Sequence, residues 1–125
     1  MLLNVSLVAL GGALGSSLRY LMGLAFVKAT AFGFPMGVLP VNIIGSFLMG
    51  VFVVFAHQKG LSTANLFVMT GVLGGFTTFS AFSLDTLRLL EDGRVSAAII
   101  YVMVSVLGAV IACGAGLMLA RSFTT

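Results

Sequence analysis

The chain has 125 residues, of which 60% are hydrophobic and only 7% are charged, and its mean hydropathy is +1.23. Soluble domains carry roughly 25% charged residues, so this composition excludes a water-facing globular surface. The net charge of +3 comes from six Lys/Arg and three Asp/Glu that are scattered singly, which leaves no basic cluster for nucleic acid. The single cysteine, Cys113, excludes an internal disulfide, and we interpret it as a small packing residue.

Long segments with few charges predict four membrane-spanning helices. About 20 apolar residues suffice to cross the hydrocarbon core of a bilayer. We expect helices over residues 2–26, 37–56, 65–90 and 95–121. A turn at 33–35 and polar loops at 57–60 and 91–94 connect them. The sequence therefore predicts an all-α integral membrane protein that forms one transmembrane domain over residues 1–125.

Small residues recur at helical spacing in the first and last of these helices. Gly11 and Gly15 form one ridge, and Gly108, Ala112 and Gly116 form a longer one. Ridges of this kind let membrane helices approach closely. We interpret them mainly as contacts within one chain, and an interface between subunits is compatible with the same pattern.

Charges at the ends of the predicted helices favour neither orientation in the membrane strongly. An even number of spans places both termini on one side, which carries the basic residues Lys59 and Arg121. The other side carries Arg19, Lys28, Arg88 and Arg94. The excess of Lys and Arg in the inner loops sets topology, so a difference of only two leaves insertion in both orientations open.

The third hydrophobic segment is interrupted by the run G-G-F-T-T-F-S at residues 74–80. Two glycines followed by two threonines weaken a helix in mid-membrane, and the freed backbone groups need partners because lipid supplies none. Carbonyls exposed at such breaks commonly bind cations. A close glycine contact in an intact helix is the alternative. The hydroxyls of Thr77, Thr78, Ser80 and Ser83 favour a functional break.

Several side chains near this run have the chemistry to face an anion. Phe79 and Phe82 are three residues apart on one helix face, and the edge of an aromatic ring carries partial positive charge. Tyr101 and Ser105 present hydroxyls four residues apart in the last helix, and Asn42 is an amide deep within the second. Ordinary packing and hydrogen bonding between helices remain the alternatives for these residues.

The sequence carries no pattern typical of an enzyme. It contains no nucleophile with its base, no metal-binding cluster and no phosphate loop, and its only histidine, His57, lies in a predicted loop. Asp85, Glu91 and Asp92 are expected at or beyond the end of the third segment. A proton-coupled exporter needs a titratable group within the membrane, so that class is disfavoured.

Four stretches of the sequence together resemble a known family. Residues 11–15 with Arg19 resemble its first-helix pattern, and residues 37–45 (G-V-L-P-V-N-I-I-G) resemble its second-helix pattern. Residues 71–83 (G-V-L-G-G-F-T-T-F-S-A-F-S) are similar to its long, specific signature. Polar residues of its fourth helix match Tyr101 and Ser105. On these motifs the chain is identified as a member of the CrcB/Fluc family of bacterial fluoride channels over essentially its full length.

The resemblance implies an antiparallel, dual-topology homodimer in the bacterial cytoplasmic (inner) membrane, with two fluoride pores that are each built from both subunits. It implies passive, uncoupled export of fluoride, and a structural sodium ion held by backbone carbonyls that match Gly74 and Thr77. Arg19 matches a family arginine near the vestibule. The implied pore residues are Asn42, Phe79, Phe82, Ser80, Tyr101 and Ser105.

The chain also departs from the family pattern. Val38 and Ala81 stand where threonine is usual, Ala109 lacks a hydroxyl, Asp85 replaces a glutamate, and Pro40 predicts a kink near the start of the second helix. These departures affect the number of hydroxyls per pore and leave the glycine pair and the phenylalanine pair unchanged. The rival classes are a small four-helix multidrug exporter and a non-conducting membrane assembly subunit.

Overall fold

The computed structural model describes residues 1–27, 35–60 and 62–124, and its regular elements over these ranges are all helices. They are α1 (Leu2–Val27), α2 (Leu39–Lys59), α3 (Ser62–Asn65), η1 (Leu66–Leu73), α4 (Gly74–Phe76), α5 (Phe79–Glu91) and α6 (Val95–Ser122). Four helical segments of the described chain are long and apolar enough to cross a membrane, and the third of them runs from α3 to α5. The predicted all-α architecture with four spans is confirmed.

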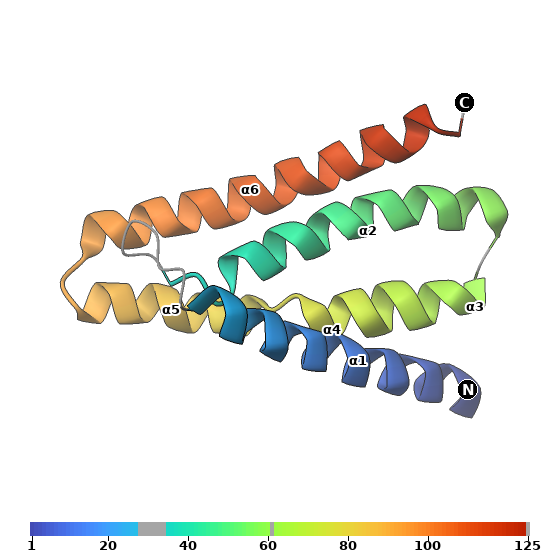
Figure 1. Ribbon diagram of the computed structural model, residues 1–125, viewed down its shortest axis with the longest axis horizontal. Helices are drawn as coiled ribbons and strands as arrows, with labels where there is room; N and C mark the ends of the chain where they lie inside the picture. Colours follow the sequence, from blue (N-terminus) through green and yellow to red (C-terminus); the bar gives the residue numbers. More distant parts are fainter. Residues whose placement is uncertain (28–34, 61, 125) are drawn as a thin grey trace.

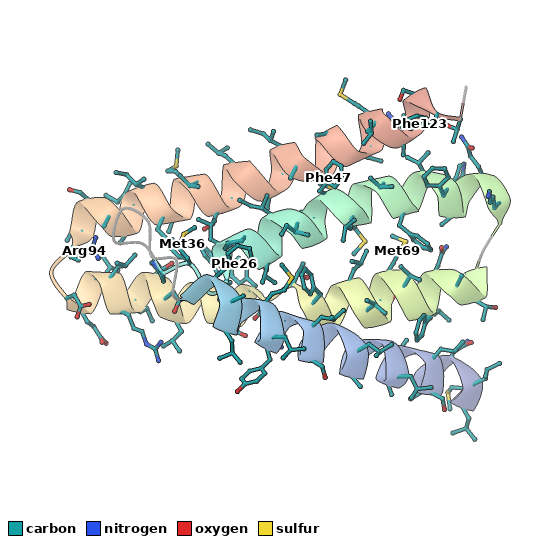
Figure 2. All side chains as sticks on the ribbon, in the orientation of Figure 1. Phe26, Met36, Phe47, Met69, Arg94 and Phe123 are labelled. Atoms are coloured by element: carbon teal, nitrogen blue, oxygen red, sulfur yellow. The ribbon has the colours of Figure 1, made fainter. Side chains whose placement is uncertain are left out.

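The spanning segments lie side by side as two helix pairs (Figure 1). α6 packs along α2, whereas α1 packs against η1 and α4, and α5 continues the third span to pack against α6. Both termini lie at one end of the molecule (Figure 1), and the label of Arg94 marks the opposite end (Figure 2). Side chains project outward along the helices (Figure 2). Many of the exposed ones are large and apolar, and Ile111, for example, is 68% exposed. This apolar exterior suits contact with lipid.

Glycines in the left-handed region end two of the spanning helices. Gly60 (φ 62°) follows α2, and Gly93 (φ 77°) follows α5. The amide N–H groups of Gly93 and Arg94 donate to the carbonyls of Leu90 and Leu89, at 3.0 and 2.9 Å. This arrangement satisfies carbonyls that have no partner at a helix end, so the polar loop after the third span can be very short.

The second helix begins slightly later than predicted, at Leu39 instead of residue 37. Pro40 lies in its first turn, where the backbone N–H groups have no acceptor within the helix and proline is well accommodated. Pro40 therefore favours the start of α2. A proline at this position does not require the kink that the sequence predicted. The predicted turn at 33–35, except for Pro35, and the basic residue at 28 lie outside the described residues.

The glycine ridges bring helix backbones into direct contact. A Cβ on Gly15 would lie 2.8 Å from the amide nitrogen of Phe76, and a Cβ on Gly116 would lie 3.0 Å from that of Val51. No larger side chain fits at either contact without moving a backbone. The first ridge therefore packs on η1 and α4 and the second on α2, which confirms their interpretation as contacts within one chain.

The third span is interrupted within the predicted run at residues 74–80, at its threonines and not at its glycines. Gly74 is helical (φ −63°, ψ −38°), whereas Thr77 (φ −83°, ψ 155°) and Thr78 (φ −152°, ψ 121°) are extended. Extended backbone is well suited to β-branched threonine. Gly75 serves a close contact instead, because a Cβ there would lie 2.8 Å from the carbonyl oxygen of Gly12. The threonine pair, and not the glycine pair, forms the break.

Candidate ion site at the helix break

Asn42 of α2 binds the backbone of Thr78, the second residue of the break. Its Nδ2 donates to the Thr78 carbonyl oxygen at 2.9 Å, and its Oδ1 accepts the Thr78 N–H at 2.8 Å. In the lipid interior an unpaired backbone group costs several kcal/mol, so this one amide stabilises the interruption. A carboxamide has two N–H donors, so one of them remains for another acceptor.

The break also frees carbonyl oxygens that a continuous helix would use. The N–H of Thr78 bonds Asn42 instead of the carbonyl of Gly74, and the N–H of Ala81 bonds Oγ1 of Thr78 at 3.3 Å instead of the carbonyl of Thr77. Within the described residues, the carbonyls of Gly74 and Thr77 have no other backbone donor. Such oxygens are the ligands that hard cations prefer.

Arg19 of α1 supports the same break from the opposite side. Its Nε donates to the carbonyl oxygen of Gly75 at 3.1 Å. Arg19 also lines a cavity of about 510 Å³ together with Met36, Asp85 and Arg88. Arg19 therefore lies beside a cavity, as the vestibule position implied by the resemblance requires, and it also holds the backbone of the break.

Asp85 lies inside α5, six residues before its last residue, Glu91, and not at the end of the span as the sequence suggested. Its carboxylate pairs with Arg88 at 3.7 Å and accepts the Tyr101 hydroxyl at a long 3.5 Å. The predicted end of the third helix at residue 90 differs from the observed one by a single residue, so Asp85 was inside the predicted helix as well, and treating it as a residue at the end of the span was wrong. A carboxylate is therefore present within the third span, with a cation beside it.

A groove of about 370 Å³ opens beside the break and is walled by α2, α5 and α6. Its lining includes four of the predicted pore residues, Asn42, Phe79, Phe82 and Ser105. The other lining residues are Gly45, Ser46, Met49, Thr77, Thr78, Val106, Ala109, Val110 and Cys113. None of the lining side chains carries a formal charge. A charged ligand in the groove would therefore meet only neutral hydrogen-bonding groups, aromatic rings and aliphatic groups.

Three aromatic rings are in contact in sequence, two of which, Phe79 and Phe82, line the groove. The centroids of Phe79 and Phe82 lie 5.3 Å apart with the rings tilted at 58°, and those of Phe82 and Tyr101 lie 5.6 Å apart with the rings stacked. Phe82 and Tyr101 are buried, whereas Phe79 is 75% exposed. Phe79 lies within the third membrane-spanning segment, so its exposed ring faces either lipid or another subunit.

Three predicted or candidate hydroxyls differ in their surroundings. Ser105 is buried, and its Oγ has no hydrogen-bond partner among the described residues. Ser80 is exposed and does not line the groove, although its Oγ lies 3.2 Å from Oγ1 of Thr78. Tyr101 lies behind Phe82 and reaches toward Asp85. The structure therefore brings Ser105 to the groove and leaves Ser80 and Tyr101 beside it.

Two contacts that support the break were not predicted: the capping role of Thr78, whose hydroxyl the sequence had marked only as part of a polar run, and the close packing at Gly45. Thr78 begins α5 as its N-cap by accepting the N–H of Ala81, and a threonine just before a helical run is a signal for that role. Gly45 leaves room for the break, because a Cβ there would overlap the methyl group of Thr77 and lie 3.1 Å from the ring of Phe76. No local pattern in the sequence reveals that second contact.

Comparison with known proteins identifies the family. The model of the family described as "CrcB-like protein, Camphor Resistance (CrcB)" matches residues 6–117. The chain is 53% identical to a fluoride-specific ion channel FluC of Ruegeria sp. (strain TM1040) over the full length of both. It is 52% identical to the FluC of Roseobacter denitrificans, over 94% of this chain and 95% of that one. It is 45% identical to the FluC of Mesorhizobium japonicum, over 95% and 97%. These relatives are named ion channels and not enzymes. The family match over residues 6–117 and the identities over nearly the full length show that the chain belongs to the CrcB-like family of membrane proteins, as its motifs indicated.

Proposed function

We propose that the chain is a fluoride-specific ion channel that exports fluoride passively from the cytoplasm. The observation that carries this proposal is the uncharged groove at the break, which gathers Asn42, Phe79, Phe82 and Ser105 in a chain whose full-length relatives are named fluoride-specific ion channels. Fluoride is small and strongly hydrated, so a channel must replace its water with close donors. Amide and hydroxyl donors and ring edges do this without the full charge that would bind the ion too tightly to conduct.

The proposed path uses the predicted pore residues in different ways. Asn42 uses one of its two side-chain N–H groups to bind Thr78 and can donate the other to the ion. Ser105 can donate its hydroxyl, which has no partner among the described residues. Phe79 and Phe82 line the groove, and we propose that the ion passes the positive edges of their rings. Ser80 and Tyr101 do not line the groove but contact residues that do, Thr78 and Phe82, and we propose that they meet the ion outside the groove.

We propose further that two copies assemble as an antiparallel homodimer with two pores, each completed by the partner. Two features of one chain support this assembly. The exposed ring of Phe79 lies at the groove and lacks a cover. The weak charge bias of the sequence permits both orientations in a bacterial cytoplasmic membrane.

The break fits the structural sodium ion that the family resemblance implies. The carbonyl oxygens of Gly74 and Thr77 lack helical donors, and oxygen ligands of this type suit a hard monovalent cation. When bound, the ion would supply a fixed positive charge that holds the two half-helices together. Arg19 would supply a second one, because it occupies the neighbouring carbonyl of Gly75.

Passive flow is suited to removing fluoride that enters a cell as the weak acid HF and dissociates inside. The cavity lined by Arg19, Arg88 and Asp85 would act as a vestibule, since its two basic side chains outnumber its one carboxylate and so raise the local concentration of an anion. The proposed partners are therefore the fluoride ion, a second copy of the chain and the lipid bilayer.

Fluoride efflux from proteoliposomes tests the proposed function. Vesicles loaded with fluoride and containing the purified chain should release it rapidly, as read by an ion-selective electrode, whereas chloride-loaded vesicles should release little chloride. No fluoride-selective release would contradict the channel. Release of hydrophobic cations driven by a proton gradient would instead identify a multidrug exporter, and no transport of either kind would leave an assembly subunit.

Replacing sodium tests the proposed cation at the break. A ligand that binds only the folded state raises stability by mass action, so the thermal unfolding midpoint of the purified protein should rise with sodium chloride. The large organic cation N-methylglucamine at equal ionic strength serves as the control and should give a lower midpoint. Equal midpoints in the two salts would argue against a stabilising sodium ion.

A further inference from the structure

The last helix carries a thiol on the face that lines the groove. Ser105, Ala109 and Cys113 follow one another at four-residue intervals in α6, so each lies one turn above the preceding one. All three line the groove beside the break. Because Ala109 has no polar side-chain atom, the thiol of Cys113 is the next polar group after the Ser105 hydroxyl along this face.

The backbone of Cys113 is held firmly in this position. A Cβ at Gly50 of α2 would overlap the carbonyl oxygen of Cys113 and lie 3.0 Å from its carbonyl carbon. The two helices therefore meet backbone to backbone at this level, and the cysteine side chain is only partly buried. Its interpretation as a packing residue holds for the backbone, whereas its side chain belongs to the wall of the groove.

A second observation indicates that a ligand reaches this wall. Ser105 is only 6% exposed, and its Oγ has no hydrogen-bond partner within the described part of the chain. A buried hydroxyl without a partner is unfavourable, and it is even less favourable in a membrane, so it calls for a ligand. Asn42, which has a spare N–H, lines the same groove.

We infer that Cys113 lines the fluoride path beyond Ala109, and that it is the site at which a small thiol-reactive compound stops the flux. The inference rests on the proposed channel function. A thiol donates only weak hydrogen bonds, so Cys113 forms part of the wall and is not a strong binding group for fluoride. Because Cys113 lines the groove, a group added to its sulfur would occupy part of the path. The lining carries no formal charge, so the effect of a small neutral group is steric and not electrostatic.

The chemistry of the modification is simple and needs no external oxidant. The Cys113 thiol loses its proton to water, and the resulting thiolate attacks the methyl-bearing sulfur of methyl methanethiosulfonate. The sulfur–sulfur bond of the reagent breaks, methanesulfinate leaves with the electron pair, and Cys113 carries a methyl disulfide. Dithiothreitol reverses the reaction by exchange and restores the thiol.

The unmodified protein is itself the single-cysteine probe, since Cys113 is the only cysteine in the chain. Proteoliposomes are treated with methyl methanethiosulfonate, labelling is measured by intact mass, and each fluoride efflux rate is compared with that of the same protein before treatment. We expect complete labelling to slow efflux about tenfold or more, because conduction requires an open path, and dithiothreitol to restore it. The Cys113→Ser variant should show no change on treatment.

A thiol placed elsewhere on α6 provides the matched control. Ile111 is 68% exposed and does not line the groove, so the double variant Cys113→Ser with Ile111→Cys should become labelled and keep its own efflux rate. Equal inhibition of this variant overturns the inference. So does full labelling of Cys113 without inhibition, failure of Cys113 to react in the membrane, or inhibition that coincides with dissociation of the dimer on a sizing column. Absence of efflux before any treatment instead overturns the proposed function, and the inference with it.

Discussion

Replacing Asn42 with alanine is expected to abolish fluoride flux and to destabilise the folded protein. The substitution leaves the N–H and the carbonyl of Thr78 without their partners. Each unpaired buried backbone group costs about 1–3 kcal/mol, so the free energy of unfolding should fall by about 2–6 kcal/mol. The measurements are fluoride efflux from proteoliposomes and detergent-induced unfolding at a fixed protein concentration, because dissociation of an oligomer contributes to the latter.

The chain offers a second asparagine as a control. The Oδ1 of Asn65 is buried and has no hydrogen-bond partner among the described residues, so Asn65→Ala removes no such bond at that atom. We expect this variant to keep its flux and its stability. A purely ion-binding role for Asn42 predicts a different result, in which Asn42→Ala loses flux while its unfolding free energy stays unchanged. That result would show that the contact with Thr78 is not what stabilises the break.

Replacing Gly15 with alanine is expected to separate α1 from the third span. The added Cβ would overlap the carbonyl oxygen of Val72 and lie 2.8 Å from the amide nitrogen of Phe76. These atoms are backbone, so a helix must shift to accept the methyl group. Overpacking costs about 1–3 kcal/mol, whereas alanine gains about 1 kcal/mol in helix propensity over glycine. We expect a net loss of stability, and loss of flux because α4 leads directly into the break.

Gly12, in the same helix, is the matched control for this contact. A Cβ on Gly12 meets no atom of the described residues within 4 Å, so Gly12→Ala changes helix propensity without creating an overlap. We expect its unfolding midpoint to equal or exceed that of the unmodified protein. If the two alanine variants are destabilised equally, contact between α1 and the third span does not explain the need for Gly15.

The extent of the helices could be predicted because it depends on local composition. Apolar runs bounded by charges predicted the spans, and the observed limits of α1 and α6 differ from the predicted ones by a single residue at the carboxyl end. The exact position of the break could not be predicted in this way. Glycine next to threonine indicates a weak point, but Gly74 and Gly75 stay helical while the extended residues are Thr77 and Thr78.

The sequence allowed the candidate site residues to be identified by the chemistry of their side chains. It did not allow the contacts between them to be predicted. Asn42 was predicted as a possible donor to an ion, and its partnership with Thr78 spans 36 residues, so no local pattern contains it. Asp85 was placed at the end of a span because it is charged, although the predicted helix ran to residue 90, close to the observed end at Glu91. Cys113 was predicted to be a packing residue, and only the structure shows that its side chain lines the groove together with Ser105 and Ala109.

By itself, the sequence determined that this protein lies in a membrane, that four helices cross it, and that the third one is weak near its middle. Those properties follow from hydropathy and backbone propensity, which act over a few residues at a time. Only the tertiary structure decided which carbonyls lose their donors, which amide replaces them, and which face of α6 meets the groove. These are contacts between segments far apart in sequence, and they depend on how closely glycines let the helices approach.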